Sequence, residues 1–178
     1  MARIAFTTFG VLHELPAHPR SKGFMDRIAE TYAAAERSEG FIERSIRDAN
    51  NWTHSWGEQV CPNFLAPELL PHVAQTLSIW QDTESVFAFS YADFHAEGMK
   101  DRKDWFRNPD YPNYVAWWIA DDYKPTFAEA TKRLEILQES GSNPDAFSFK
   151  SPYDAEGKPT SLDQVLIREK ILRNRFNK

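Results

Sequence analysis

Apolar and polar positions alternate along the chain in a way that separates strands from helices. Ala2–Phe9 alternates loosely and stops at Gly10, which predicts an opening strand. Apolar residues then recur at helical spacing from Gly23 to Ser38, where Ser38-Glu39-Gly40 is a typical helix stop. Alternation resumes after Gly40 and meets turn residues at 48–51. A second strand therefore either continues through a bulge or forms a hairpin with the WTHSWG stretch.

The stretch from Thr76 to Phe106 organises the middle of the chain. Thr76–Trp80 ends a β-branched run, and Asp82 or Thr83 can cap the helix that follows. We expect that helix to be long and amphipathic and to reach Phe106. One row on it consists of residues spaced by four, four and three positions, which share a helix face: Tyr91, His95, Met99 and Arg102. This row is the first candidate site.

The remaining pattern predicts two more strands and two more helices. The apolar run Tyr114–Ala120 is typical of a strand, and Thr126 stands three residues before Glu129 in a capping-box arrangement that begins a helix ending at Ser140-Gly141. AFSFKSPY predicts a short final strand. We assign residues 1–154 to one domain and residues 155–178 to a linker and a charged amphipathic C-terminal helix.

This order of elements predicts an α+β fold, with helices on one face of a mainly antiparallel sheet. A chain of 178 residues with 42% hydrophobic content supports one core. An uncovered second sheet face that is rich in Trp and Ile would be costly in water. We therefore expect a homodimer that stacks two sheets face to face.

Charge and composition narrow the class of protein. The net charge is −5 and the pI is about 5.6, with Lys and Arg scattered among acidic residues, so no nucleic-acid partner is expected. No segment approaches the roughly 20 apolar residues of a membrane span, and no signal sequence is apparent, which favours a soluble cytoplasmic protein with no membrane partner. Cys61 is the only cysteine, and an inert small side chain is favoured over a nucleophile.

The long predicted helix carries the first catalytic candidate. The imidazole of His95 can abstract a phenolic or α-carbonyl proton near neutral pH, although a structural hydrogen bond to Tyr91 or to a backbone carbonyl would also explain it. Arg102 can hold a substrate carboxylate or enolate, and the alternative is a solvated helix end.

A second group of candidates lies outside that helix. If residues 52–56 are extended, Trp52, His54 and Trp56 share one face and can stack on a flat aromatic substrate, or they can belong to the core or to an interface. His13 follows the first strand in a loop where Glu14 can orient it. A metal site made of the three histidines at positions 13, 54 and 95 has no supporting motif, so we expect no metal.

Three linked segments resemble an uncharacterised-function family of the dimeric α/β barrel superfamily, which is related to the antibiotic biosynthesis monooxygenases. They are WQDTESVFAFSYADFHAEGMKDRKDWF, YVAWWIADDYKPTFAEATKRLEIL and DAFSFKSPYD. The resemblance covers nearly the whole chain up to Asp154. It implies a ferredoxin-like protomer, a homodimer formed by sheet-to-sheet packing, and a pocket between sheet and helices. Trp, Asn and His commonly line the pockets of such relatives, and Trp80 and His95 fall in the similar segments.

The resemblance implies a small-molecule enzyme of secondary or aromatic metabolism. Its most specific form is a cofactor-independent monooxygenase acting on a phenolic or polyketide-like substrate, with a histidine as base. One alternative is a proton-transfer isomerase, cyclase or lyase; another is a non-catalytic small-molecule or haem-binding dimer with His95 or His54 as axial ligand. No glycine-rich phosphate loop is present, so no nucleotide cofactor is expected. The expected substrate-binding residues are Trp52, Trp56, Trp80, Tyr91, Met99, Arg102 and Trp117.

Overall fold

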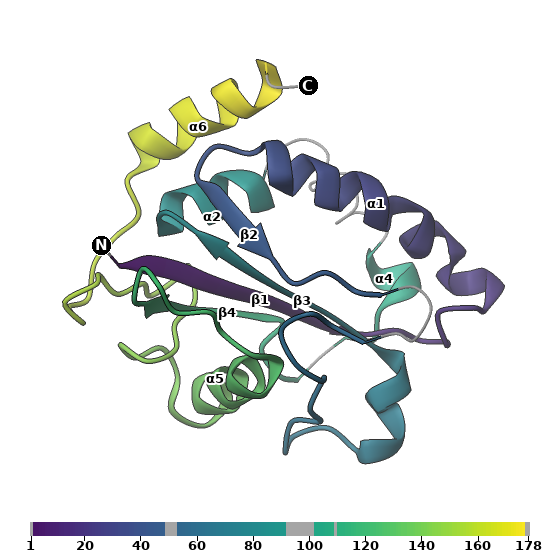
Figure 1. The fold of residues 1–178 in the computed structure, drawn as a ribbon. Helices are drawn as coiled ribbons and strands as arrows, with labels where there is room; N and C mark the ends of the chain where they lie inside the picture. Colours follow the sequence, from purple (N-terminus) through teal and green to yellow (C-terminus); the bar gives the residue numbers. More distant parts are fainter. Residues whose placement is uncertain (1, 49–52, 92–101, 109, 177–178) are drawn as a thin grey trace.

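The computed structural model describes residues 2–48, 53–91, 102–108 and 110–176, and its centre is one antiparallel sheet (Figure 1). The strands are β1 (Arg3–Val11), β2 (Phe41–Arg44), β3 (Val73–Trp80) and β4 (Tyr114–Ile119), and they lie in the order β2-β3-β1-β4. Helix α1 (Lys22–Arg37) joins β1 to β2, and α2 (Thr83–Ser90) follows β3. This connectivity and strand order are those of a ferredoxin-like α+β fold, which confirms the predicted class.

The strand register sorts the core into two layers. Ile4 of β1 lies opposite Trp80 of β3 and Trp118 of β4, so these side chains belong to one face. That face packs beneath α1 and α2. The opposite face carries a second, larger set of buried side chains, which are Ala5, Phe9, Val11, Val73, Leu77, Ile79, Val115, Trp117 and Ile119.

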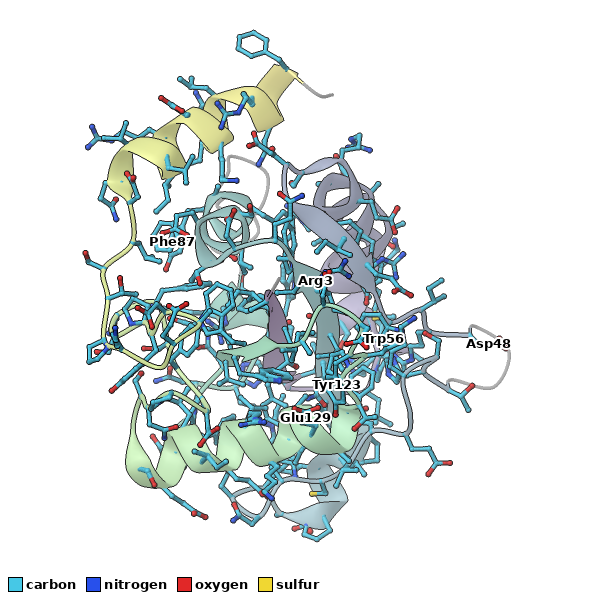
Figure 2. The ribbon with its side chains drawn as sticks, turned by 60° about the vertical axis from the view of Figure 1, so that its left-hand side comes forward. Arg3, Asp48, Trp56, Phe87, Tyr123 and Glu129 are labelled. Atoms are coloured by element: carbon cyan, nitrogen blue, oxygen red, sulfur yellow. The ribbon has the colours of Figure 1, made fainter. Side chains whose placement is uncertain are left out.

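Helices cover both faces of the sheet, which differs from the expected arrangement. Helix α5 (Phe127–Ser140) packs on the face opposite to α1 and α2, where Phe127, Ala130 and Leu134 are fully buried (Figure 1). Figure 2 shows Tyr123 and Glu129 together on this side, where the tyrosine hydroxyl donates a 2.8 Å hydrogen bond to the carboxylate. The chain itself thus covers the face that was expected to need a partner. The homodimer stays a prediction, which light scattering would check.

Two helix starts follow the predicted capping chemistry. The Asp82 carboxylate accepts a 2.7 Å hydrogen bond from the backbone N–H of Ser85, and the Thr126 hydroxyl accepts one of 3.2 Å from Glu129. The predicted long helix does not continue to Phe106, however. Helix α2 ends at Ser90, and the short helix α4 (Arg102–Trp105) is a separate element.

The segments between the main elements settle two open questions. Residues 46–48 and 53–55 pair with each other as the two arms of a hairpin, since Asp48 N–H donates to the Thr53 carbonyl and Ser55 N–H to the Ile46 carbonyl, both at 2.9 Å. The predicted final strand is reduced to isolated antiparallel bridges, of which the one between Phe147 and Ala116 joins it to β4. Short 3-10 helices occupy η1 (Pro19–Ser21) and η2 (Pro67–His72).

The C-terminal helix α6 (Gln164–Phe176) is present as predicted and packs against α2. Lys170 anchors it: this residue is only 4% exposed, and its ammonium group lies 2.9 Å from the Ser85 hydroxyl and 3.3 Å from the Asp82 carboxylate. A third contact, at 3.4 Å, reaches Glu39. Within the described residues, every helix is too short or too polar to cross a bilayer.

Candidate functional site

A cavity of about 450 Å³ lies between the sheet and helix α1. Its floor includes Thr8 and Thr76, which are cross-strand neighbours whose hydroxyl oxygens lie 2.7 Å apart. Phe24, Ile28 and Tyr32 of α1 form the opposite wall. The volume and the mainly apolar wall are typical of a small-molecule site.

The cavity exists because α1 packs against the sheet at one end only. Ala35, near the end of the helix, is its one buried residue within the described chain. Trp105 of α4 and Phe106, the residue that follows this helix, close the other end, where a Cβ placed on Gly10 would lie 2.7 Å from the Phe106 ring. Glycine at position 10 therefore lets Phe106 lie directly on β1, and the same ring contacts Phe24 edge to face at 4.9 Å.

Two basic side chains reach the cavity from the hairpin after β2. Arg47 and His54 are paired across that hairpin, and both line the cavity. Strand β2 ends at Arg44, so the hairpin occupies the sheet edge beside the first residues of β3. Burial, and then the positive charge of Arg47, lower the pKa of His54 from 6.5 to about 4. The imidazole is therefore neutral at pH 7 and can accept a proton.

This pKa gives a direct prediction. In an NMR titration the ring C–H signal of His54 is expected to move with a midpoint near 4 instead of 6.5. Since the unfolded chain binds this proton first, stability should fall as the pH drops from 6.5 toward 4 and should change little through His54 above 6.5. An Arg47→Gln variant should raise the midpoint only in part, because burial is the larger cause. A midpoint at 6.5 would show that His54 is exposed.

Tyr32 supplies a polar group on the helix wall. Burial raises the pKa of its hydroxyl, and the charges of Arg44 and Arg47 oppose that rise in part. The Arg44 guanidinium lies 3.9 Å from the centre of the ring. The phenol therefore stays protonated at neutral pH and can donate a hydrogen bond to a ligand.

A third basic group lies at the other edge of the sheet. Arg102, the first residue of α4, is half-buried and lines the cavity. With the amide of Asn113 oriented so that its oxygen faces the guanidinium, that oxygen accepts hydrogen bonds of 2.7 and 2.9 Å from the two terminal nitrogens of Arg102. Burial lowers the pKa of Arg102, although Tyr111 partly opposes this, and an arginine remains charged at neutral pH.

Three of the predicted site residues line the cavity, namely His54, Tyr91 and Arg102. Tyr91 is 56% exposed, and its ring stacks on Phe87 at 4.3 Å between centres. His95, Met99 and Trp52 lie outside the described residues.

The other predicted site residues lie away from the cavity. Trp56 and Trp117 are buried in the core layer between the sheet and α5. Trp117 donates a 3.0 Å hydrogen bond to Glu129. Trp80 is buried under α2 and donates to the Ser78 hydroxyl at 2.9 Å. His13 lies 3.2 Å from the Lys103 carbonyl and does not line the cavity. The chain turns directly after His54, so His54 and Trp56 do not share a strand face.

Tyr32, Arg47 and Asn113 were not among the predicted site residues. Tyr32 follows the helical apolar pattern of α1, which indicates a core position as readily as a cavity wall. Arg47 and Asn113 stand beside turns, where polar residues are ordinary. In the part of the chain that the structure describes, no three His, Cys, Asp or Glu side chains come together as possible metal ligands.

Two of the solved structures that match this chain are weakly similar to it. SnoaB, a cofactor-independent oxygenase from Streptomyces nogalater, has 11% sequence identity and a TM-score of 0.41 over 70% of this chain and 97% of its own. PA3566 from Pseudomonas aeruginosa has 7% identity and a TM-score of 0.42 over 71% of this chain and 97% of its own. Similarity at this level assigns no activity to this chain.

Comparison with curated proteins gives no match. A family model matches residues 3–163, which is most of the chain. The family is described as a domain of unknown function, DUF3291, so the predicted membership of an uncharacterised family is confirmed. This chain belongs to the DUF3291 family.

Proposed function

We propose that this protein is a small-molecule enzyme that forms and holds a substrate anion in the cavity between the sheet and α1. One observation carries the proposal: among the described residues, the mainly apolar cavity wall places the neutral imidazole of His54 and the half-buried guanidinium of Arg102 on the same cavity. Such a site favours a reaction in which negative charge develops on the substrate.

His54 is the proposed base. Its neutral imidazole takes a proton from a phenolic hydroxyl or from an activated carbon of a polyketide-like substrate. Burial and the charge of Arg47 disfavour an imidazolium when no anion lies beside it, as the pKa of about 4 indicates. The anion formed on the substrate lies beside the new imidazolium and stabilises its positive charge, so proton transfer and ion pairing occur together.

The proposed reaction is oxygenation without a bound cofactor. The electron-rich substrate anion reduces molecular oxygen; one oxygen atom enters the substrate and the other leaves as water, with two hydrogens lost from the substrate carbon. The apolar walls formed by Phe24, Ile28 and Phe106 exclude water from the anion. A homodimeric, cytoplasmic enzyme of secondary or aromatic metabolism is part of the same proposal.

Oxygen uptake by metal-free protein with a panel of phenolic and polyketide-like substrates tests this function. Uptake with a product that gains oxygen is expected, and His54→Gln should lower kcat/KM by about a hundredfold to ten-thousandfold. His18→Asn is the matched control, because His18 is exposed and does not line the cavity. Equal losses in both variants, or full turnover in His54→Gln, would contradict the role of His54.

The same assay separates the alternatives. An isomerised, cyclised or dehydrated product with no oxygen uptake would replace oxygenation by proton-transfer chemistry at the same base. A Soret band that appears on haem addition and disappears in His54→Gln would indicate a haem-binding protein instead.

A further inference from the structure

Arg102 is a cation held in the cavity wall without a carboxylate partner among the described residues. Its guanidinium is half-buried, and the partner that the structure shows for it is the neutral amide oxygen of Asn113. Two arginines elsewhere on the molecule have acidic partners instead: Arg44 pairs with Glu36, and Arg173 pairs with Glu39. The guanidinium of Arg102 is therefore hydrogen-bonded, but no described carboxylate neutralises its positive charge.

Such an arrangement is costly unless something else supplies negative charge. A half-buried guanidinium loses part of its hydration, and an amide oxygen returns only part of that free energy. The Asn113 contacts fix the plane of the guanidinium, and N–H groups remain on it for another acceptor. A planar carboxylate matches this group, because it can accept two parallel hydrogen bonds.

The position of Arg102 relative to His54 indicates how a ligand would lie. Asn113 immediately precedes β4, at one edge of the sheet, whereas His54 belongs to the hairpin beyond β2, at the other edge. Neighbouring strands lie about 4.8 Å apart. The two groups are thus separated by the width of β1 and β3, whose Thr8 and Thr76 form the floor. This span suits a flat body of fused or linked rings.

We propose, building on the proposed function, that the substrates of this site are aromatic carboxylates whose carboxylate binds Arg102 while the ring system extends across Thr8 and Thr76 toward His54. The aromatic side chains beside Arg102 favour an apolar body over a sugar or a peptide. These are Phe24, Trp105 and Phe106. Two tasks then fall to two residues, since Arg102 holds the carboxylate and His54 acts at the far end of the ring system.

Calorimetric binding tests this without any turnover. Naphthoate is expected to bind the unmodified protein about tenfold to a hundredfold more tightly than naphthamide, since the two differ in charge and hardly in shape. This ligand pair requires no variant, so the result does not depend on how well a mutant folds. Equal affinity for the two compounds would overturn the proposal.

The variant Asn113→Asp tests most directly whether the charge of Arg102 causes the preference for naphthoate. It places a carboxylate against Arg102 with almost no change in volume, so the preference for naphthoate should fall at least tenfold while the thermal midpoint is kept or raised. Arg102→Met should lose the same preference. Arg107→Gln is the matched control, because it removes one nearby positive charge that is exposed and outside the cavity wall. An unchanged preference in Asn113→Asp would contradict the assignment of Arg102.

The outcomes distinguish the two proposals. Selective naphthoate binding, with no oxygen uptake by the protein on any substrate tested, would support carboxylate binding at Arg102 and contradict oxygenation. Oxygenation of phenols combined with equal binding of naphthoate and naphthamide would support the proposed function and contradict carboxylate binding at Arg102.

Discussion

Gly40→Ala is expected to lower the free energy of unfolding by about 3 kcal/mol, a large effect for the addition of a single methyl group. Gly40 has a φ of +81°, in the left-handed region that side chains disfavour. A Cβ at this position would also lie 2.1 Å from the Ser85 hydroxyl oxygen and 2.7 Å from its Cβ. Ser85 cannot move away freely, because it is fully buried and holds both Asp82 and Lys170.

Gly141→Ala separates the backbone effect from the steric effect. Gly141 has a similar φ of +69°, but no atom lies within 4 Å of its added Cβ. Only the backbone effect remains. Because the ψ of Gly141 is −174°, in a region almost confined to glycine, a loss of about 1 to 2 kcal/mol is expected, below that of Gly40→Ala. Urea denaturation of both variants measures the difference. Equal losses would show that the contact with Ser85 relaxes without cost.

Lys170→Met is expected to destabilise the protein by about 2 kcal/mol and to release α6. The substitution keeps an unbranched side chain but leaves Asp82 and Glu39 without their shared cation. Both carboxylates are one-third exposed, so water compensates in part and the loss stays below that of a fully buried pair. Asp82 also caps α2, and the end of α2 reaches the cavity at Ser90.

Hydrogen exchange locates the effect of this substitution. Amides of α6 and of the first turn of α2 should exchange faster in Lys170→Met, while those of β1 and β3 should change only with global stability. Lys132→Met is the matched control, because Lys132 is exposed on α5 and its loss should change stability by no more than about 0.5 kcal/mol. Unchanged protection of α6 would mean that Lys170 does not anchor it.

Local chemistry explains which elements the sequence predicts well. The caps at Asp82 and Thr126 depend on a side chain and an amide three residues later, so a short stretch of sequence contains all the needed information. Strands β1 and β4 likewise follow from their own apolar runs. The ferredoxin-like order then follows from the alternation of helices and strands.

The arrangement of the layers depends on information that is not local. Period-two alternation shows that Trp117 and Trp118 face opposite sides, but it does not show which side α5 will cover. Helix α5 covers the sheet face that is opposite to α1 and α2. Trp117 is buried against this helix, so the expected bare face does not exist. Similarly, helical spacing continues past Ser90 in sequence, yet α2 ends there.

The candidate site was predictable only in part for the same reason. His54 and Arg102 were identified by residue type and position, and both reach the cavity. Tyr32 has the helical spacing of a core residue, and this spacing does not distinguish the packed face of a helix from a cavity wall. Whether α1 packs closely on the sheet or stands away from it depends on Phe106 and Trp105, which lie far away in sequence.

A crystal structure of the protein with naphthoate bound would show directly whether the cavity is an anion site. We expect the ring system between the floor at Thr8 and Thr76 and the wall at Tyr32, with the carboxylate within hydrogen-bond distance of Arg102. Naphthoate bound outside the cavity, or an empty cavity in crystals saturated with naphthoate, would contradict this assignment.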